Sequence, residues 1–434
     1  MNDREQAVVI KGKMSSYKAV QSGVPQGSVL GPLLFLVYIN DIVKDIESLV
    51  KLFADDTSMY LRLNDGVTRT YILNSDITKI LDWSRRWKVD FNPSKTELLT
   101  IANIRDYYTY QLVFDNSILL ETNAHKHLGV ILQNDCKWNS HIESIVAKTR
   151  PLIACFRSFK YKFNRKTLEI LYKSYILPHF DYADVVWDNC SAVLSNELEN
   201  IHLDALRTII GAVKGTSHEK LYLESGFTSL QERRKRHKLI LFFKLVNGIL
   251  PVYLNAYIPP LVSDINPYPR RRPSERQVPE FRLETYHDTY FPSTTELWND
   301  LPDTIKEETS ISSFKRKMCA DDPLVPPYYY IGSRKPQTIH CELRICMSDL
   351  NNDLFSRHIS DNKECECGHR KEDASHYLLK CTRFENARST SIDILPPLAR
   401  NVNTLLYGNR EFSLPFNCYI FLTVQEFIVK SERF

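Results

Sequence analysis

The chain has 434 residues, enough for two or three domains, and its 43% hydrophobic and 11% aromatic content is that of a globular protein. Its formal net charge of +4 indicates a polyanionic partner only where the basic residues cluster. The longest apolar run, residues 29–39, contains Gly and Pro and is shorter than the roughly 20 residues of a membrane-spanning helix. No signal peptide follows Met1, so we expect an intracellular protein, nuclear or cytoplasmic, without a membrane segment.

The first elements surround a pair of adjacent carboxylates. Residues 8–10 and 17–20 predict two paired strands, and a Gly/Pro/Gln loop then opens an apolar stretch in which we expect a buried helix from about 32 to 45. Residues 50–53 and 57–61 predict a hairpin whose tight turn carries Asp55 and Asp56. Two carboxylates side by side suit Mg²⁺, and two such metals are the usual device for in-line nucleotidyl transfer. The alternative is ordinary turn chemistry, since Asp favours turns.

Short elements follow as far as residue 135. Asp76 can cap a helix that runs to about Trp87. Residues 91–96 turn into a strand at 98–101, and residues 110–114 and 118–120 predict a hairpin around Asp115-Asn116. Residues 127–130 predict one more short strand. This first part of the chain therefore reads as a small antiparallel sheet with helices.

From about residue 136 the apolar spacing becomes helical. Residues 167–176 fit one helix face, with Pro178 as its end, and apolar positions from 198 to 209 mark the next helix. Ser229 and Glu232 form a capping-box pattern before a helix to Gly248. This helix begins with a basic cluster that could follow nucleic-acid phosphates or be an ordinary solvated face, namely Arg233, Arg234, Lys235, Arg236 and Lys238.

A stiff basic linker, residues 267–279, separates this part from a segment rich in Cys and His. Ten cysteines are too sparse for a disulfide scaffold, but three crowd between 365 and 381, which suggests a metal in a reducing compartment. A closed Cys₃His zinc site could use Cys365, Cys367, His376 and Cys381. Its first spacing departs from the usual Cys-x-x-Cys, His369 is a substitute ligand, and buried free thiols are the alternative. A helix at about 418–431 closes the chain.

Two motifs resemble the palm of a reverse transcriptase from a non-LTR (LINE-type) retrotransposon. They are Ser-Gly-Val-Pro-Gln-Gly-Ser at 22–28 with the apolar stretch behind it, and Phe53-Ala54-Asp55-Asp56 about 25 residues later. The resemblance implies that Asp55 and Asp56 hold two Mg²⁺ ions, with Phe53 and Ala54 beside the nucleotide. It also implies that the glycine loop contacts nucleotide and template through Gly23, Pro25, Gln26 and Gly27. The alternative is a loop that only caps the helix.

The resemblance extends weakly along the rest of the chain. Lys95, after Asn92, matches a lysine near the pyrophosphate, although a surface lysine in a turn is the alternative. Residues 127–130 match a segment that supports the primer end, with a simple packing strand as the other reading. The helical part resembles the family's thumb, and the Cys/His segment resembles its C-terminal region.

We therefore expect an α+β fold built from four parts. These are a partial palm at 1–135, a helical thumb and connection at 136–260, a basic linker and connector at 261–335, and a zinc-bearing C-terminal region at 336–434. The implied function is RNA-directed DNA synthesis with two Mg²⁺ ions and a structural Zn²⁺. The implied partners are an RNA template, a DNA primer, deoxynucleoside triphosphates and other polypeptides of the element.

The resemblance also places a further catalytic Asp, and the fingers subdomain, before residue 2. We therefore expect the chain to lack them and to be inactive alone. Three hypotheses follow: a polymerase completed by another segment, a nucleic-acid-binding module without chemistry, and an inactive relic of the element.

Overall fold

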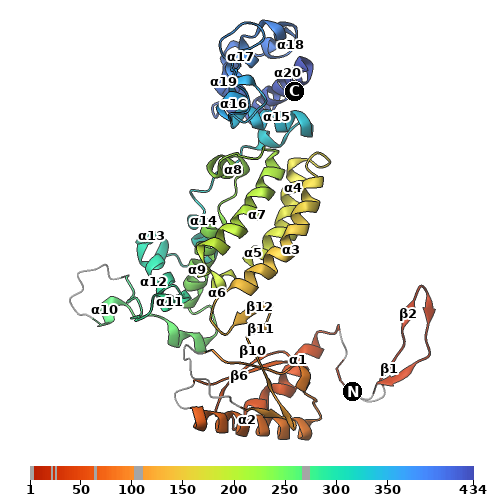
Figure 1. The fold of residues 1–434 in the computed structure, drawn as a ribbon, viewed down its shortest axis with the longest axis vertical. Helices are drawn as coiled ribbons and strands as arrows, with labels where there is room; N and C mark the ends of the chain where they lie inside the picture. The colour runs from red at the N-terminus through yellow and green to blue at the C-terminus, as the bar shows by residue number, and fades with distance from the viewer. Residues whose placement is uncertain (1–3, 21–22, 25–26, 63–65, 102–110, 266–273) are drawn as a thin grey trace. The chain divides into compact units, whose positions relative to one another are not determined.

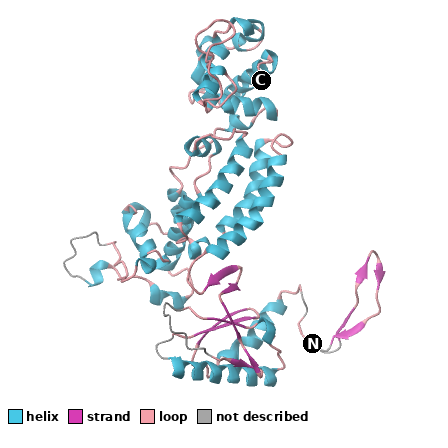
Figure 2. Cartoon of the chain, viewed as in Figure 1, coloured by secondary structure: helices cyan, strands magenta, loops and turns pink. Residues whose placement is uncertain are grey.

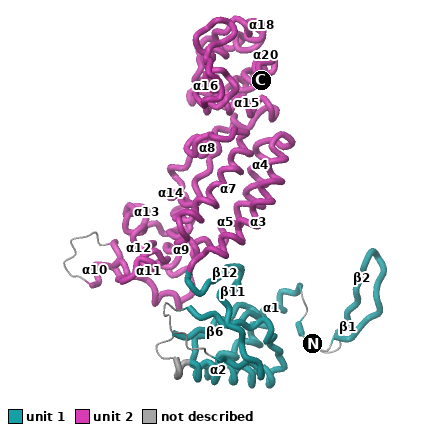
Figure 3. The backbone as a smooth tube through the Cα atoms, in the orientation of Figure 1, with its two compact units in different colours: residues 1–136 teal, residues 137–434 magenta. Residues whose placement is uncertain are grey.

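The computed structural model describes residues 4–20, 23–24, 27–62, 66–101, 111–265 and 274–434. The chain divides into two compact units, residues 1–136 and residues 137–434, coloured separately in Figure 3. Figure 1 colours the chain from red at its N-terminus to blue at its C-terminus and labels many of the elements. Short strands occur in the first unit, whereas the second is built from helices (Figure 2). The expectation of a fold that mixes helices with a small sheet is confirmed.

Unit 1 pairs its described strands two by two. Five pairs are antiparallel and one, β7 with β10, is parallel. The strands are β1 (Arg4–Gln6), β2 (Val9–Ile10), β3 (Lys13–Met14), β4 (Lys18–Val20), β5 (Leu49–Phe53), β6 (Asp56–Tyr60), β7 (Glu97–Leu99), β8 (Val113–Phe114), β9 (Ser117–Ile118), β10 (Leu120–Thr122), β11 (Ala124–His127) and β12 (Val130–Gln133).

The first hairpin differs from the predicted pairing. β2 pairs with β3 across the two-residue turn Lys11-Gly12, and β1 pairs with β4 outside it. Lys11 and Gly12 both have positive φ, 49° and 78°, as a two-residue hairpin turn requires. The predicted partnership of 8–10 with 17–20 is therefore wrong, because the tight turn pairs its own immediate flanks.

The hairpins predicted around the two acidic turns are confirmed. β5 and β6 pair from Leu49 opposite Tyr60 down to Phe53 opposite Asp56. β8 and β9 flank Asp115 and Asn116, which both have positive φ. Asp and Asn tolerate a positive φ, so local turn chemistry accounts for the turn at Asp115-Asn116.

The apolar helix is not buried as predicted. It consists of α1 (Leu30–Ile39) and the 3-10 helix η1 (Asn40–Val43). Ile39 and Ile42 are buried, but Leu33 is 56% exposed and Val37 69% exposed. The buried positions pack against Ile80 and Trp83 of α2 (Gly66–Trp87), Phe35 packs on the same cluster, and Tyr38 contacts Trp83. The other large apolar side chains of α1 are exposed.

Asp76 lies inside α2 rather than at its start, so the predicted N-cap is wrong. Its carboxylate is fully buried and accepts hydrogen bonds from the backbone N–H groups of Glu47 (3.1 Å) and Ser48 (2.7 Å). Lys79 donates to it at 2.9 Å. Asp76 thus fixes the loop before β5 and so positions the acidic hairpin.

Unit 2 opens with a helical bundle that matches the predicted change in periodicity. Its apolar core includes Ile142, Trp187, Leu198 and Leu206, each fully buried. The bundle is formed by α3 (Asn139–Ser158), α4 (Arg165–Leu171), the π-helical turn η3 (Tyr172–Ile176), α5 (Leu177–Asp181), α6 (Asp184–Trp187), α7 (Ala192–Ile210) and α8 (His218–Ser225).

Pro178 does not end a helix, contrary to the prediction. It lies in the first turn of α5, where its missing N–H costs nothing, and η3 joins α4 to α5 through a wider turn. Because a π turn frees the backbone groups that the proline ring would obstruct, the chain continues with only a local change of helix type.

The helix α9 (Leu230–Val246) begins as the capping box predicts, since Ser229 Oγ accepts from Glu232 N at 3.1 Å. Phe242 and Phe243 of α9 pack with Trp298 and Phe314, so the segment after the predicted linker also folds onto this helix. That segment contains η4 (Val252–Tyr257), α10 (Val262–Ile265), α11 (Glu284–His287), α12 (Tyr290–Asp300), α13 (Asp303–Lys306) and α14 (Ile311–Met318). Residues 266–273 of the linker lie outside the described residues.

The C-terminal part has its own apolar cluster around the closing helix. The predicted inner face of that helix is confirmed, because Ile420, Phe421, Val424, Phe427 and Ile428 are all buried. The elements are η5 (Pro327–Tyr330), α15 (Arg334–Arg344), α16 (Asn351–Ser356), α17 (Ala374–Leu379), η6 (Thr382–Phe384), α18 (Glu385–Ser389), η7 (Ile392–Ile394), η8 (Pro397–Ala399), α19 (Val402–Tyr407) and α20 (Leu414–Ser431). None of the described helices combines the length and the apolar character needed to cross a membrane.

Candidate functional site

The acidic turn of unit 1 displays its two carboxylates at the end of a regular hairpin. Ala54 and Asp55 form the two-residue turn, with Ala54 at φ 52°, and Asp56 is the first residue of β6. Both aspartates are exposed, as are Phe53 and Ala54. The carboxylates are therefore open to solvent and to a ligand such as a hydrated cation.

A neighbouring strand brings one histidine to this hairpin. The Nδ1 atom of His127 on β11 lies 3.5 Å from Ser58 Oγ on β6, two residues after Asp56. His125, on the same strand face, lies 2.7 Å from the Glu97 carboxylate on β7. The sequence interpretation did not include His125 or Glu97, although the alternation of His125 and His127 on a strand was a signal for a shared face.

The glycine loop has the backbone freedom that a close approach to a ligand needs. Gly23 and Gly27 have φ of 83° and 78°, and among the described residues, chain neighbours aside, no heavy atom lies within 4 Å of the place that a Cβ would occupy at either position. Arg4 donates to the Gly23 carbonyl at 2.7 Å. Pro25 and Gln26 lie outside the described residues.

Lys95 ends the 3-10 helix η2 (Pro93–Lys95), which leads into β7. Asn92 caps this turn by accepting from Ser94 N at 3.0 Å, and the Lys95 side chain is exposed. No ion pair joins Lys95 to Asp55 or Asp56 within the part of the chain that the structure describes. Its role beside a pyrophosphate stays a prediction.

Two groups of three or more ligating side chains lie close together among the described residues. One is the predicted set Cys365, Cys367, His376 and Cys381, and the other is Asp181, Asp184 and His237. Asp55 and Asp56 belong to neither group, so no third carboxylate or imidazole from the described residues converges on the acidic turn.

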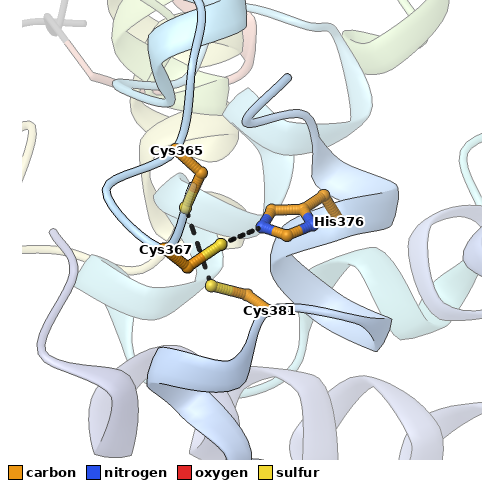
Figure 4. A group of neighbouring side chains, drawn as sticks. All are labelled: Cys365, Cys367, His376 and Cys381. Carbon is orange, nitrogen blue, oxygen red and sulfur yellow. Dashed lines mark hydrogen bonds between the residues drawn. The ribbon is translucent and has the colours of Figure 1, made fainter. Parts of the chain in front are cut away.

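The four side chains of the Cys/His group point toward one another, with their ligand atoms within 4.8 Å of each other (Figure 4). Cys365 and Cys381 sulfurs are 3.6 Å apart, and Cys367 Sγ lies 3.3 Å from His376 Nε2. Four ligands at ordinary zinc distances would give sulfur–sulfur separations of about 3.7 Å and sulfur–nitrogen separations of about 3.5 Å. The four side chains therefore surround a space of the right size for one ion.

Local structure explains how the unusual Cys-x-Cys spacing still brings both thiols inward. Cys365 N donates to the His369 carbonyl at 2.9 Å, and Gly368 N donates to the Cys365 carbonyl at 2.9 Å. Gly368, at φ 88°, allows this tight turn. His376 lies on α17, whose N-cap Asp373 accepts from His376 N at 2.9 Å.

The donor set itself fits a divalent metal that prefers thiolate and imidazole. Burial raises the pKa of the Cys365 thiol to about 12, so a nearby cation is what would hold it as a thiolate. The His376 Nδ1 atom is buried and has no hydrogen-bond partner among the described residues, which leaves Nε2 directed at the sulfurs. His369 stacks on His376 with ring centroids 4.1 Å apart instead of pointing into the group.

Four of the five basic residues at the start of α9 are engaged within unit 2. Arg233 binds Asp181 at 2.6 Å, and Arg236 binds Asp322 at 2.6 Å. Arg234 and Lys238 both bind Asp188, each at 2.9 Å. Lys235 is exposed. A phosphate would have to compete with these carboxylates, so backbone contact by the four stays a prediction that the structure does not favour.

The second group is a hydrogen-bonded network between α5, α6 and α9. His237 Nδ1 lies 2.5 Å from the buried carboxylate of Asp184, and Arg233 occupies both oxygens of Asp181. Burial raises the pKa of Asp184 although His237 opposes this effect. Because an arginine already satisfies Asp181, this group holds helices together rather than presenting free ligands.

Comparisons with known proteins agree with the motifs of unit 1. Residues 4–132 match the family described as reverse transcriptase (RNA-dependent DNA polymerase). The RNA-directed DNA polymerase from mobile element jockey of Drosophila funebris is 29% identical over 48% of this chain. The probable RNA-directed DNA polymerase from transposon X-element of Drosophila melanogaster is 25% identical over 55%. The Pol polyprotein from type-1 retrotransposable element R1 of Bradysia coprophila is 19% identical over 86%.

The chain spans about a quarter of the length of the jockey and X-element relatives, with aligned shares of 24% and 27%. The alignment with the R1 relative covers 35% of that protein. No solved structure matched the chain.

Proposed function

Because residues 4–132 carry a reverse transcriptase domain of the non-LTR retrotransposon type, we propose that Asp55 and Asp56 hold the catalytic Mg²⁺ of an RNA-directed DNA polymerase. The observation that carries the proposal is the β5–β6 hairpin, which presents both carboxylates, exposed and adjacent, at its end. Carboxylate oxygens on a rigid strand pair are the ligands and the support that Mg²⁺ needs.

The bound ions would activate the primer 3′-hydroxyl and stabilise the leaving pyrophosphate. Asp55 and Asp56 would supply two negative charges from consecutive residues of the hairpin. Gly23 and Gly27, with no side chain in the way, let backbone groups approach the nucleotide. Lys95 is the candidate proton donor to the pyrophosphate, because its side chain is exposed and has no ion pair among the described residues.

Two carboxylates alone leave most coordination positions of Mg²⁺ to other groups. We propose that water, nucleotide phosphates and a further carboxylate from another segment of the polymerase complete the site. The RNA template, DNA primer and deoxynucleoside triphosphates are the corresponding partners, with other polypeptides of the element as further ones.

At the other end of the chain, we propose a structural Zn²⁺ bound by Cys365, Cys367, His376 and Cys381. The support is the 3.6 Å and 3.3 Å separations of paired ligand atoms, together with four donors that would fill a tetrahedral shell. A closed shell has no open position for a substrate, so this ion would stabilise the C-terminal fold and perform no chemistry.

The second candidate function is a nucleic-acid-binding module without chemistry. One observation favours it: no third ligand from the described residues joins Asp55 and Asp56, whereas unit 2 has dense cores and a prebuilt Cys/His group. On this alternative the chain binds primer and template but leaves catalysis to another polypeptide.

Primer extension on an RNA template in Mg²⁺ separates the two candidates. With the polymerase segment that supplies the further carboxylate present in the reaction, the proposal expects incorporation that Asp55→Asn and Asp56→Asn each abolish while binding of primer–template is retained. Glu307→Gln, which removes an exposed carboxylate of unit 2, is the matched control and should leave incorporation unchanged. Incorporation that survives Asp55→Asn would contradict the polymerase assignment of this turn, and binding without incorporation would favour the second candidate.

A further inference from the structure

A large cavity of about 880 Å³ lies in unit 2 between η3, α9 and α14. Its size is in the range of pockets that hold ligands of nucleotide dimensions. Apolar side chains such as Ile240 and Leu241 form part of its wall, and basic side chains from three separate elements also line it. The lining carboxylates, each of them paired with a basic side chain, are Glu169, Asp184 and Asp322. The cavity belongs entirely to unit 2 and is separate from the acidic turn.

The cations of this cavity fall into two sets. Arg233 and Arg236 are half-buried and are held by Asp181 and Asp322. Lys173, Lys244 and Lys315 also line the cavity, but none of them has a carboxylate within ion-pair distance among the residues that the structure describes. The arginines are thus already neutralised, and the three lysines are available for an anion.

Each of the three lysines without an ion pair lies on a different element of the fold. Lys173 lies on the π-helical turn η3, with its ammonium 5.0 Å from the centre of the Phe227 ring. Lys244 lies in the last turn of α9, and Lys315 lies on α14, which packs against α9. Because the three lysines come from different elements and line one cavity, they are not an ordinary solvent-exposed face of a single helix.

We propose that this cavity binds backbone phosphates of a single nucleic-acid strand through Lys173, Lys244 and Lys315, an inference that rests on the proposed polymerase function. Ammonium groups act on phosphate as point charges and tolerate many orientations, which suits a strand of variable sequence. The apolar wall would contact sugars and base edges. The phosphates would therefore contact these three lysines and not the cations at the start of α9, which are paired with carboxylates.

A binding titration of the full chain tests this proposal. The probe is a fluorescent single-stranded RNA oligonucleotide, followed by anisotropy at several salt concentrations without Mg²⁺ or nucleotides. We expect K173A/K244A/K315A to bind at least 10-fold more weakly and to lower the salt slope by about 2, because each phosphate contact on a single strand contributes about 0.7. The corresponding single variants should each show part of the loss.

The matched control is K148A/K166A/K214A, which removes three exposed lysines of unit 2 that do not line the cavity. It should bind within twofold of the unaltered chain, and thermal melts should match for all variants, since none of the six lysines has an ion-pair partner among the described residues. Equal losses in both triple variants, or no loss in the first, would overturn the proposal.

A second arm distinguishes a strand from a free nucleotide. Competition by a deoxynucleoside triphosphate is measured on the same proteins. If the cavity variant weakens triphosphate binding but not oligonucleotide binding, the strand proposal is overturned and the cavity is a nucleotide site. These binding measurements need neither Mg²⁺ nor the acidic turn. A negative result here would therefore not decide the primer-extension test of Asp55 and Asp56.

Discussion

Unit 1 and unit 2 differ in how far each completes its own candidate site. In unit 1 the buried cores are small, helix α1 exposes most of its apolar surface, and the acidic turn has two ligands. In unit 2 three apolar clusters surround buried ion pairs, and the Cys/His group brings four ligands together. The proposed zinc site would be complete within its own fold, whereas the proposed polymerase site would leave positions open for substrates.

The largest expected effect comes from removing the Zn²⁺ that we propose at the Cys/His group. Cys381→Ser, or a strong chelator, should unfold the C-terminal part, because structural zinc contributes on the order of 10 kcal/mol of binding free energy at pH 7. Hydrogen exchange over α15–α20 is the measurement. Cys346→Ser removes an exposed thiol outside the group and is the control. Equal protection in both variants would show that the group is not a metal site.

The next largest effect concerns the buried charges that join the bundle to α15. Glu224 is buried and accepts from Arg344 at 2.7 Å and from Arg165 at 3.1 Å. Although burial alone would raise the pKa of Glu224, the two guanidinium groups lower it. Glu224→Gln should reduce the free energy of unfolding by about 3–5 kcal/mol, because it leaves the buried Arg344 without a counter-charge and Arg165 with Glu169 alone. Urea denaturation measures the change.

The exposed pair of Arg150 with Glu197 provides the control for Glu224. Glu197→Gln should change the free energy of unfolding by less than about 1 kcal/mol. The lowered pKa of Glu224 also means that its contribution is present above the ordinary carboxyl pKa and is lost as pH falls through the folded-state pKa. If Glu224→Gln is as stable as Glu197→Gln, the buried ion pairs of Glu224 do not stabilise unit 2.

A third test uses pH. Burial raises the pKa of Glu342 on α15 to about 7. The folded state therefore retains a proton that the unfolded chain loses, so stability falls as pH rises from about 4.5 to 7. Glu342→Gln should flatten this region of the pH profile and add on the order of 2 kcal/mol at pH 8. An unchanged profile in urea titrations across pH 4.5–8 would contradict the buried environment of this carboxyl.

The smallest expected effect lies on the open helix of unit 1. Val37→Ser should change stability by less than about 0.5 kcal/mol, because Val37 is 69% exposed and the two residues have similar helix propensities. Ile39→Ala on the buried side should cost about 2–4 kcal/mol. If Val37→Ser is as costly as Ile39→Ala, this face is covered in solution and unit 1 is less open than the comparison holds.

The sequence predicted well what short-range chemistry decides. The turn at Ala54-Asp55, the cap at Ser229 and the inner face of α20 all depend on residues within a few positions of one another. The Cys/His group was also found, because its four residue types stand within 17 positions, although their convergence rests on the turn at Gly368.

The sequence failed where a distant partner decides the outcome. Asp76 looks like a helix cap, but its partners are backbone groups at 47 and 48. Arg233 and Arg236 look like a free basic face, but their counter-charges are Asp181 and Asp322, 52 and 86 residues away. The apolar content of α1 gave no sign that most of it would be exposed, because composition does not say what lies opposite a helix.

Whether the Asp55–Asp56 turn holds a divalent ion can be tested by measuring the binding of Mn²⁺. Mn²⁺ takes the same carboxylate ligands and is detected by electron paramagnetic resonance. We expect the unaltered chain to bind Mn²⁺ with a deoxynucleoside triphosphate and D55N/D56N to lose this binding. The variant E307Q/E308Q, which removes another pair of consecutive acidic residues, should retain it. Equal Mn²⁺ binding by all three proteins would contradict this expectation.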